Sequence, residues 1–361
     1  MRTVGIAIAT GLSCAVALAG DVPPEKDRYS NHSKLLVYID DHGREQPVTT
    51  LDNWARRKAD IAAGMQRAMG PLPSRDDLPP LDMRVTETSK VNGLTRLKLT
   101  FVAEENDRVP AWLFLPERAA GERSPAMLAL HQTTTIGKDE PAGMGPMKNL
   151  HYGLELAQRG YVVLMPDYPS FGEYEFDFKT SGRASGTIKG IFNHMRCVDL
   201  LQSREEVDPE RIGVIGHSLG GHNAMFVAAF DERLKVVVSS CGWTPFHDYY
   251  EGKIAGWTSD RYMPRLRDVY GLDPDHVPFD FYEVVASFAP RAFFSNSPLH
   301  DANFEVAGVK KAVAAVKDVY DLFDADDALV VRYPDCEHDF PPEIRKEAYE
   351  FIDRALRPTT P

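Results

Sequence analysis

Short apolar segments alternate with longer helical segments along most of the chain, and this alternation constrains the fold more than any other feature. Each apolar segment is only four or five residues long, which favours a buried strand over a buried helix. The expected strands are residues 126–130, 161–165, 212–215, 235–239, 292–295 and 329–333. The expected helices are residues 150–159, 187–205, 219–230, 303–322 and 342–356. This order predicts an α/β fold, with a mostly parallel central sheet flanked by helices on both faces.

Three segments that precede this region alternate apolar and polar residues, at 81–88, 94–103 and 109–115. They predict antiparallel strands that lead into the same sheet. We therefore expect one large domain over residues 81–361. Residues 242–288 hold many aromatic residues without a strand period, and they are too long for a plain connection. They predict a cap-like insertion after the sixth core strand, over the carboxyl edge of the sheet.

The N-terminal region divides into a leader and an arm. Arg2, the apolar run 4–18 and the sequence Ala17-Leu18-Ala19 predict a signal peptide over residues 1–19. The apolar run is too short to span a bilayer comfortably, so we expect export to the periplasm or the outside and no stable membrane span in the mature chain. Residues 20–80 are polar and rich in proline, and they predict an arm with one helix that ends before Gly70-Pro71.

Charge and cysteine content exclude some classes of protein. The formal net charge is -12 and no run rich in lysine and arginine is present, which argues against a nucleic-acid partner. Cys14 would leave with the leader, so Cys197, Cys241 and Cys336 remain. An odd number leaves at least one cysteine unpaired or paired between chains, and the spacing matches no metal site. The sequence leaves the pairing and the oligomeric state open.

The segment Gly216-His217-Ser218-Leu219-Gly220 is the strongest chemical signal in the chain. It matches the pattern Gly-x-Ser-x-Gly, and an expected strand precedes it and an expected helix follows it. That context is typical of a nucleophile elbow, in which a sharp turn presents the serine at the edge of the sheet. Ser218 is therefore the expected nucleophile.

A serine nucleophile needs a base that takes its proton. His338 lies in the loop after the last expected strand and before the last helix, where this type of enzyme carries its histidine. His276 and His300 are the other downstream candidates. His276 falls within the insertion and His300 precedes the expected acid, so we expect His338 to be the base.

The acid that orients the histidine should follow the penultimate strand. Asp301 occupies that loop. The alternative role for Asp301 is an N-cap of the helix that starts near Asn303. Asp324, Asp326 and Asp327, close to the last strand, are the fallback acids.

Two backbone amides should stabilise the oxyanion. Leu219, which follows the nucleophile, supplies one of them, and Gln132, just past strand 126–130, supplies the other. His131 in the same loop and Trp243, which follows strand 235–239, are candidate substrate contacts.

These motifs resemble bacterial α/β-hydrolases of the dienelactone hydrolase and acetyl xylan esterase kind. The resemblance covers residues 94–356, and it rests on Leu130-His131-Gln132-Thr133, Gly137-Lys138, Pro166-Asp167-Tyr168, Gly216-His217-Ser218-Leu219-Gly220-Gly221, Asp301-Ala302-Asn303-Phe304 and His338-Asp339-Phe340-Pro341. Dienelactone hydrolases use a cysteine nucleophile, so the serine favours the esterases. The resemblance implies a serine ester hydrolase that needs no metal or cofactor and acts on a carbohydrate or small-acyl ester.

Two other functions remain as alternatives. The first is a serine peptidase of the prolyl-oligopeptidase kind, which shares the elbow and the triad order. Residues 20–120 are too few to form the N-terminal propeller of such a peptidase. The second is a hydrolase-fold binding protein without activity, which the presence of all three expected catalytic residues disfavours.

Overall fold

The structure is a computed structural model that describes residues 28–117 and 121–357. The expected signal peptide, residues 1–19, and Cys14 lie outside the described residues. No helix within the described part of the chain is long and apolar enough to cross a membrane.

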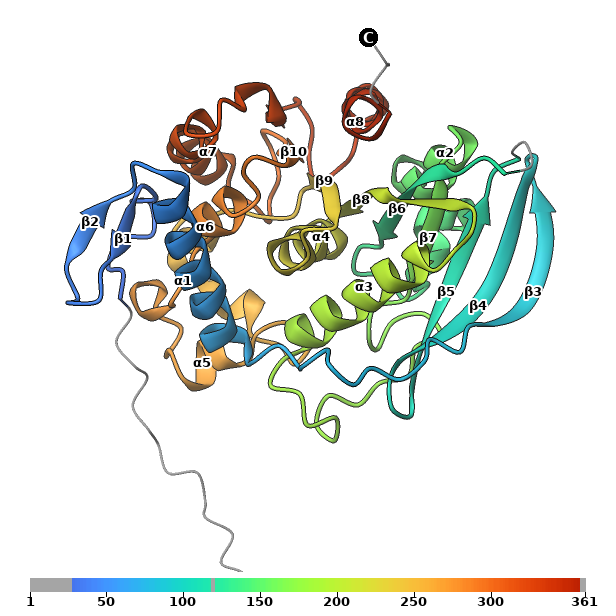
Figure 1. The fold of residues 1–361 in the computed structure, drawn as a ribbon, viewed down its shortest axis with the longest axis horizontal. Coiled ribbons are helices and arrows are strands. Elements are labelled where there is room, and N and C mark those ends of the chain that lie inside the picture. The colour runs from blue at the N-terminus through green and yellow to red at the C-terminus, as the bar shows by residue number, and fades with distance from the viewer. Residues whose placement is uncertain (1–27, 118–120, 358–361) are drawn as a thin grey trace, which may run out of the picture.

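A nine-stranded sheet forms the centre of the molecule (Figure 1). The three strands before the parallel region pair antiparallel, and the others pair in parallel. The predicted mostly parallel α/β sheet is therefore confirmed. In sheet order the strands are β11 (Leu329–Arg332), β10 (Ala292–Asn296), β9 (Leu234–Ser240), β8 (Val207–His217), β6 (Ser124–Leu130), β7 (Val162–Pro166), β5 (Asp107–Leu115), β4 (Leu94–Glu104) and β3 (Arg84–Val91).

The helices cover both faces of this sheet. In β6, Leu128 and Leu130 belong to one apolar cluster while Met127 and Ala129 belong to a second, as expected when successive side chains point to opposite faces. The first cluster includes residues of α3 and α4, and the second includes residues of α2 and α8. Figure 1 shows these two pairs on opposite sides of the sheet. The helices are α2 (Tyr152–Gln158), α3 (Gly186–Gln202), α4 (Leu219–Phe230), α7 (Val306–Asp321) and α8 (Pro342–Leu356).

The N-terminal arm packs onto the domain through α1 (Leu51–Met69), the predicted helix. Thr50 caps its N-terminus by accepting a hydrogen bond from the Asn53 amide. A small hairpin of β1 (Val37–Ile39) and β2 (Glu45–Pro47) precedes the helix, and the sequence analysis did not predict it.

A fully buried ion pair joins the arm to the insertion. The guanidinium of Arg57 on α1 donates to the carboxylate of Glu283, and both side chains are almost inaccessible to solvent. Nδ1 of His32 lies 2.9 Å from the same carboxylate. Because a buried charge is costly unless it is paired, these contacts fix the arm and the insertion to each other.

The insertion belongs to the main core. It begins directly after β9, which is the seventh strand of the sheet along the chain, and it contains α5 (Arg265–Asp268) and α6 (Phe281–Ala286). Its apolar side chains are buried in the same cluster as α1 and α4, so the insertion is a packed part of the domain. Those side chains include Trp243, Phe246, Ile254, Trp257, Met263 and Leu266.

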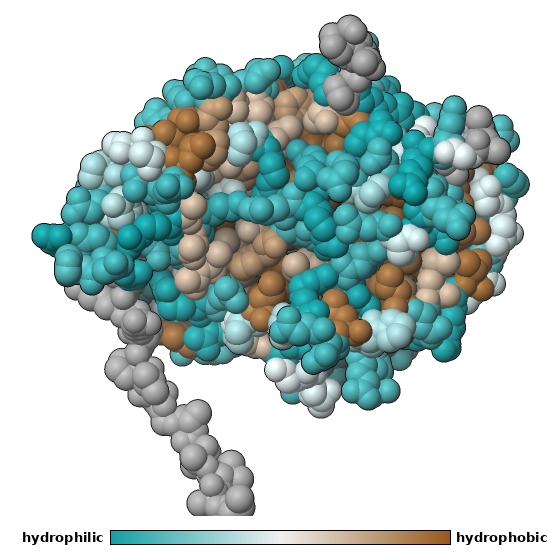
Figure 2. Space-filling view, in the orientation of Figure 1, coloured by the Kyte–Doolittle hydropathy of each residue, from teal (hydrophilic) through white to brown (hydrophobic). Residues whose placement is uncertain are grey.

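An apolar hollow remains between α1 and the neighbouring elements (Figure 2). Its volume is about 500 Å³. None of the residues that line it is a predicted catalytic or oxyanion residue. They include Leu51, Trp54, Ala59, Ala229, Pro290 and Phe323.

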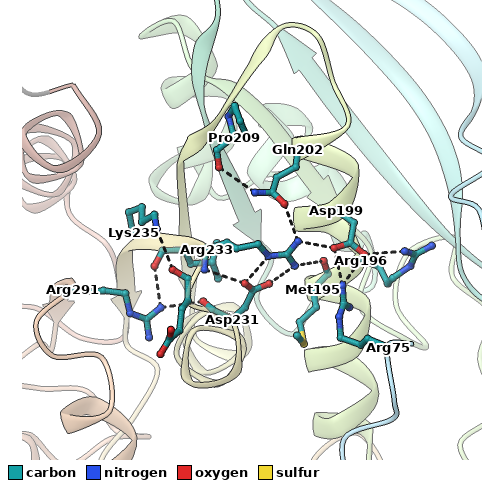
Figure 3. Close-up of polar contacts among 12 residues, drawn as sticks. Arg75, Met195, Arg196, Asp199, Gln202, Pro209, Asp231, Arg233, Lys235 and Arg291 are labelled. Atoms are coloured by element: carbon teal, nitrogen blue, oxygen red, sulfur yellow. Dashed lines mark hydrogen bonds and ion pairs between the residues drawn. The ribbon is translucent and has the colours of Figure 1, made fainter. Parts of the chain in front are cut away.

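A charged cluster ties α3, the arm and the start of β9 together (Figure 3). The carboxylate of Asp199 on α3 accepts hydrogen bonds from Arg75, Arg196 and Arg233 at 2.7–2.9 Å. Burial alone would raise the pKa of Asp199, but the hydrogen bonds from Arg233 and Arg75 outweigh burial and lower this pKa. The ionised carboxylate therefore stabilises the folded state.

Asp199→Asn should destabilise the protein, because three guanidinium groups lose their shared negative charge. We expect the free energy of unfolding, measured with urea at pH 7, to fall by about 3 kcal/mol. A lowered carboxyl pKa stabilises the fold above the ordinary pKa of the group, and that stabilisation is lost as the pH falls through the folded value. The difference between wild type and variant should therefore shrink below about pH 4. Asp208→Asn, which breaks a more exposed pair with Arg211, is the control and should cost less than about 1 kcal/mol. Equal losses from both variants would contradict this role for Asp199.

Candidate active site

The carboxyl edge of the sheet collects the segments that carry the predicted catalytic residues. His217, Ser240, Asn296 and Arg332 lie side by side in register at the ends of β8, β9, β10 and β11. The side-chain amide of Asn296 donates to Oγ of Ser240 at 2.8 Å and to the carbonyl of Asp339 at 2.8 Å. These bonds fix the loops after the three neighbouring strands relative to one another.

Ser218 sits on a strained turn between β8 and α4. Its φ of 54° and ψ of -118° lie outside the regions that a residue with a side chain prefers. A Cβ atom on Gly216 would lie 2.2 Å from the Gly220 backbone, and one on Gly220 would lie 2.0 Å from the carbonyl oxygen of Leu130. Glycine is therefore required on both sides of the turn, which gives the geometry of a nucleophile elbow.

Asp301 and His338 meet in the loops after β10 and β11. Nδ1 of His338 lies 3.0 and 2.9 Å from the two carboxylate oxygens of Asp301. The side chain of Asp301 is 1% exposed, whereas that of His338 is 25% exposed. The carboxylate thus accepts a hydrogen bond from the protonated Nδ1, and Nε2 of His338 is left as the basic nitrogen.

Local hydrogen bonds hold the Asp301 carboxylate in place. Its Oδ1 accepts from the amides of Asn303 and Phe304 at 2.8 and 3.3 Å. The N-cap of α7 is Glu305, whose carboxylate accepts from the Ala307 amide. Asp301 therefore does not cap α7, the other role considered for it.

The remaining candidate acids and bases lie elsewhere. Asp324, Asp326 and Asp327 are exposed, and the described residues include no hydrogen bond or ion pair between them and His338. His300 is exposed and pairs with Asp335 at 2.7 Å. His276 is also exposed, on the surface of the insertion.

His217, the residue before Ser218, packs against the imidazole ring of His338. The two imidazole rings meet edge to face with their centroids 4.8 Å apart, and His217 immediately precedes Ser218. Burial and the neighbouring charge of His338 lower the pKa of His217 well below its ordinary value. His217 therefore remains neutral and does not compete with His338 for a proton. The sequence analysis gave His217 no role, although it occupies the position before the serine in the Gly-x-Ser-x-Gly pattern.

The loop after β6 holds the predicted oxyanion donor Gln132. Nδ1 of His131 donates to the Gln132 carbonyl at 2.6 Å, and Nε2 of His131 accepts from the Tyr168 amide at 2.9 Å. The Gln132 side chain donates to the buried carboxylate of Glu140 at 3.2 Å. These contacts fix the backbone around Gln132. Glu140 was not predicted, because only the folded loop brings it to Gln132.

The second predicted donor, Leu219, is the first residue of α4. The amide of His222 already bonds to the carbonyl of Ser218, so the preceding amides have no partner within the helix. They lie at the positive end of the helix dipole, directly beside Ser218, the predicted nucleophile.

Two predicted substrate contacts do not agree with the structure. Both ring nitrogens of His131 are bonded to backbone groups, and burial lowers the pKa of this residue. The side chain of Trp243 is 1% exposed, donates to Oγ of Ser295 at 3.0 Å and packs against Phe281. His131 therefore positions the loop and Trp243 belongs to the core, so neither presents a surface to a substrate.

Cys241 lies beside Asp301 and His338. Its sulfur, a carboxylate oxygen of Asp301 and a nitrogen of His338 all lie within 4.8 Å of one another, and among the described residues these side chains form the only group that could hold a metal ion. Nδ1 of His338 is already bonded to both oxygens of Asp301. Burial raises the pKa of the Cys241 thiol well above its ordinary value. The donor set thus favours a hydrogen bond between His338 and Asp301 over a metal ion. Cys197, Cys241 and Cys336 are all free thiols.

The family model described as the prolyl oligopeptidase family matches residues 150–358, which is more than half of the chain. This match contains Ser218, Asp301 and His338. The chain belongs to the prolyl oligopeptidase family. The Bacillus subtilis protein named as the putative hydrolase YtaP is 28% identical to this chain over 306 residues, which are 80% of this chain and 97% of YtaP.

Solved esterases share the fold of this member of the prolyl oligopeptidase family. A glucuronoyl esterase from Solibacter usitatus superposes with a TM-score of 0.69 at 18% identity, over 90% of this chain and 97% of the esterase. Acetyl xylan esterase 1 from Thermoanaerobacterium gives a TM-score of 0.57 at 17% identity, over 81% of this chain and 92% of the esterase. The α/β-hydrolase fold predicted from the sequence is thus confirmed, and the chain is a hydrolase-fold member of an esterase and peptidase family.

Proposed function

We propose that the protein is a serine carboxylic-ester hydrolase that works through an acyl-enzyme. The observation that carries the proposal is the hydrogen-bonded pair of Asp301 and His338 at the same sheet edge as the strained Ser218. A buried acid, a partly exposed imidazole and a serine on an elbow are the parts that acyl transfer requires.

In the first half of the reaction, Oγ of Ser218 attacks the ester carbonyl and Nε2 of His338 takes the hydroxyl proton. The carbonyl oxygen becomes an oxyanion, which the amides of Leu219 and Gln132 stabilise. The intermediate then collapses and the carbon–oxygen bond to the alcohol breaks. His338 returns the proton to the departing alcohol, and the acyl group stays on Ser218.

In the second half, water replaces the alcohol. His338 takes a proton from the water as the water oxygen attacks the acyl carbon, and the same two amides stabilise the second oxyanion. Release of Ser218 with that proton gives the carboxylic acid and restores the enzyme. Asp301 keeps its charge throughout and balances the imidazolium that forms twice in each cycle.

The substrate class within this proposal is a carbohydrate or small-acyl ester. The glucuronoyl and acetyl xylan esterases named above share the fold over most of this chain, which supports an ester bonded to a sugar. The name of the family favours a second candidate, a serine peptidase, since both reactions use the same triad.

A direct comparison of substrates tests the proposal. Purified protein should be assayed with 4-nitrophenyl acetate, acetylated xylan, the methyl ester of glucuronic acid and a prolyl 4-nitroanilide dipeptide. We expect hydrolysis of at least one ester with kcat/KM at least 100 times that for the anilide. Hydrolysis of the anilide alone would establish the peptidase instead, and no hydrolysis of any ester by folded protein would refute the proposal.

A further inference from the structure

Arg261 of the insertion packs against Phe171, which in turn contacts residues beside the proposed oxyanion donors. Arg261, in the turn 259–262, is exposed, and its guanidinium lies 4.7 Å from the centre of the Phe171 ring. Its Nε donates to Oγ of Ser170 at 2.7 Å. The cation–π contact and this one hydrogen bond orient the guanidinium and leave its two terminal nitrogens available.

Phe171 relates this cation to the oxyanion donors. It clusters with Tyr168 and Leu219, and its ring meets His131 edge to face at 5.7 Å. Leu219 and the residue after His131 carry the two proposed donor amides. The guanidinium thus lies on one side of a small apolar cluster, and the oxyanion site lies on another.

Specific contacts fix the backbone around Arg261. The hydroxyl of Tyr168 donates to the carbonyl of Arg261 at 2.6 Å, which fixes the turn of the insertion to the loop after β7. Ser170 adopts a φ of 72°, a strained value for a residue with a side chain. Strain of this kind persists where the surroundings impose it, and it is concentrated at functional sites.

The charge of Arg261 has no partner among the described residues. No described carboxylate lies within 4.0 Å of its guanidinium, although Asp260 is its neighbour in the chain.

A cavity of about 320 Å³ opens beside the guanidinium. Two acidic residues, Asp177 and Asp260, line this cavity. The carboxylate of Asp177 accepts hydrogen bonds from the amide of Lys179 and the hydroxyl of Thr180 within its own turn. The cavity therefore offers the free face of Arg261 to a ligand. It is lined by Ser170, Phe176, Asp177, Phe178, Lys179, Ser259, Asp260 and Arg261.

We propose that Arg261 is a specificity-determining residue that binds a carboxylate carried by the substrate in addition to the ester that is cleaved. A planar guanidinium with two outward nitrogens matches a carboxylate in a bidentate way. The preferred substrates are then esters of acidic molecules, such as an acidic sugar or a dicarboxylic acid with one free end. This inference rests on the proposed esterase function and narrows its substrate class.

Matched substrate pairs test this role. On the acyl side, mono-4-nitrophenyl adipate carries a carboxylate where 4-nitrophenyl hexanoate has a methyl group. On the alcohol side, 4-acetoxybenzoate carries a carboxylate where 4-methylphenyl acetate has a methyl group. In the pair that places its carboxylate near Arg261, Arg261→Leu should lower kcat/KM for the acidic ester by about tenfold or more, mainly by raising KM. The neutral ester of that pair should stay within about twofold, because no charged contact is lost.

Two further variants make the result specific. Arg261→Lys keeps the charge but loses the planar fork, so it should fall between wild type and Arg261→Leu for the acidic ester. Arg267→Leu removes a cation of the same insertion that is paired with Asp268, and it should leave the ratio of acidic to neutral activity unchanged.

The outcomes separate this inference from the proposed function. If wild type hydrolyses neutral esters but Arg261→Leu and Arg261→Lys change both members of each pair equally, or change neither, the role of Arg261 is refuted and the esterase function stands. If wild type hydrolyses none of the four esters, the role of Arg261 is refuted, and if it also hydrolyses none of the esters in the first comparison, the esterase function is refuted as well. Labelling of Ser218 by a fluorophosphonate reports whether a variant is folded. If Arg261→Leu is not folded, the comparison is made with Arg261→Lys alone.

Discussion

Ser218→Ala is expected to lower turnover of an ester by roughly 10⁶-fold, which is the scale found when the serine of a comparable triad is removed. The reason is that no other group at the elbow can form the acyl-enzyme. A fluorophosphonate probe should label wild type at Ser218 alone, and the variant should not be labelled. Turnover with a 4-nitrophenyl ester and mass spectrometry of the labelled protein measure the two effects.

The control for this prediction is Ser203→Ala. Ser203 ends α3, and its hydroxyl donates to the carbonyl of Leu200. Since Ser203 has no part in the proposed mechanism, both turnover and labelling should be retained. Labelling of another serine in folded wild type, or normal turnover in Ser218→Ala, would show that the nucleophile has been assigned wrongly.

Asp301→Asn should lower turnover by about 10⁴-fold, the loss that the equivalent change causes in a known triad. An asparagine amide can donate to Nδ1 of His338, which favours the tautomer with its proton on Nε2, and that nitrogen then cannot take the serine proton. The amide also cannot balance the imidazolium. Circular dichroism should show an unchanged fold, because the amide oxygen can still accept from the Asn303 amide.

Asp324→Asn is the matched control, since Asp324 was a fallback acid and is exposed. Its turnover should remain within about twofold of wild type, as expected for a surface substitution. A large loss in this variant together with near-normal turnover in Asp301→Asn would move the acid to the loop before β11.

The core strands and their succession along the chain could be predicted because they depend on local pattern. The segments around Leu128, Val163 and Val237 are continuously apolar, since each strand is buried on both faces, and that pattern is visible without any knowledge of contacts. The hairpin of β1 and β2 was missed because its strands are three residues each, too short to show a period, and only β1 is apolar.

The pairing of Asp301 with His338 could be predicted from chain order and loop position, and the structure brings these two side chains together as those positions imply. The direction of a side chain is a different matter. Trp243 follows the end of β9, as expected, yet its indole points into the core toward Ser295. Arg261 could not be found either, because its partners Ser170 and Phe171 lie in another loop. Glu140 could not be found because only the folded conformation of its own loop brings it to Gln132.

The buried pair of Arg57 and Glu283 has a consequence for how relatives of this protein can diverge. Loss of Glu283 leaves the Arg57 guanidinium as an uncompensated charge in an apolar interior, at about 3–5 kcal/mol, a large share of the stability of an ordinary domain. A change in one segment must therefore be accompanied by a change in the other. A chimaera that takes the insertion of a homologue, residues 242–288, should therefore fold stably only if it also takes residues 28–80 of that homologue. These two segments, distant in the sequence, must change together in evolution.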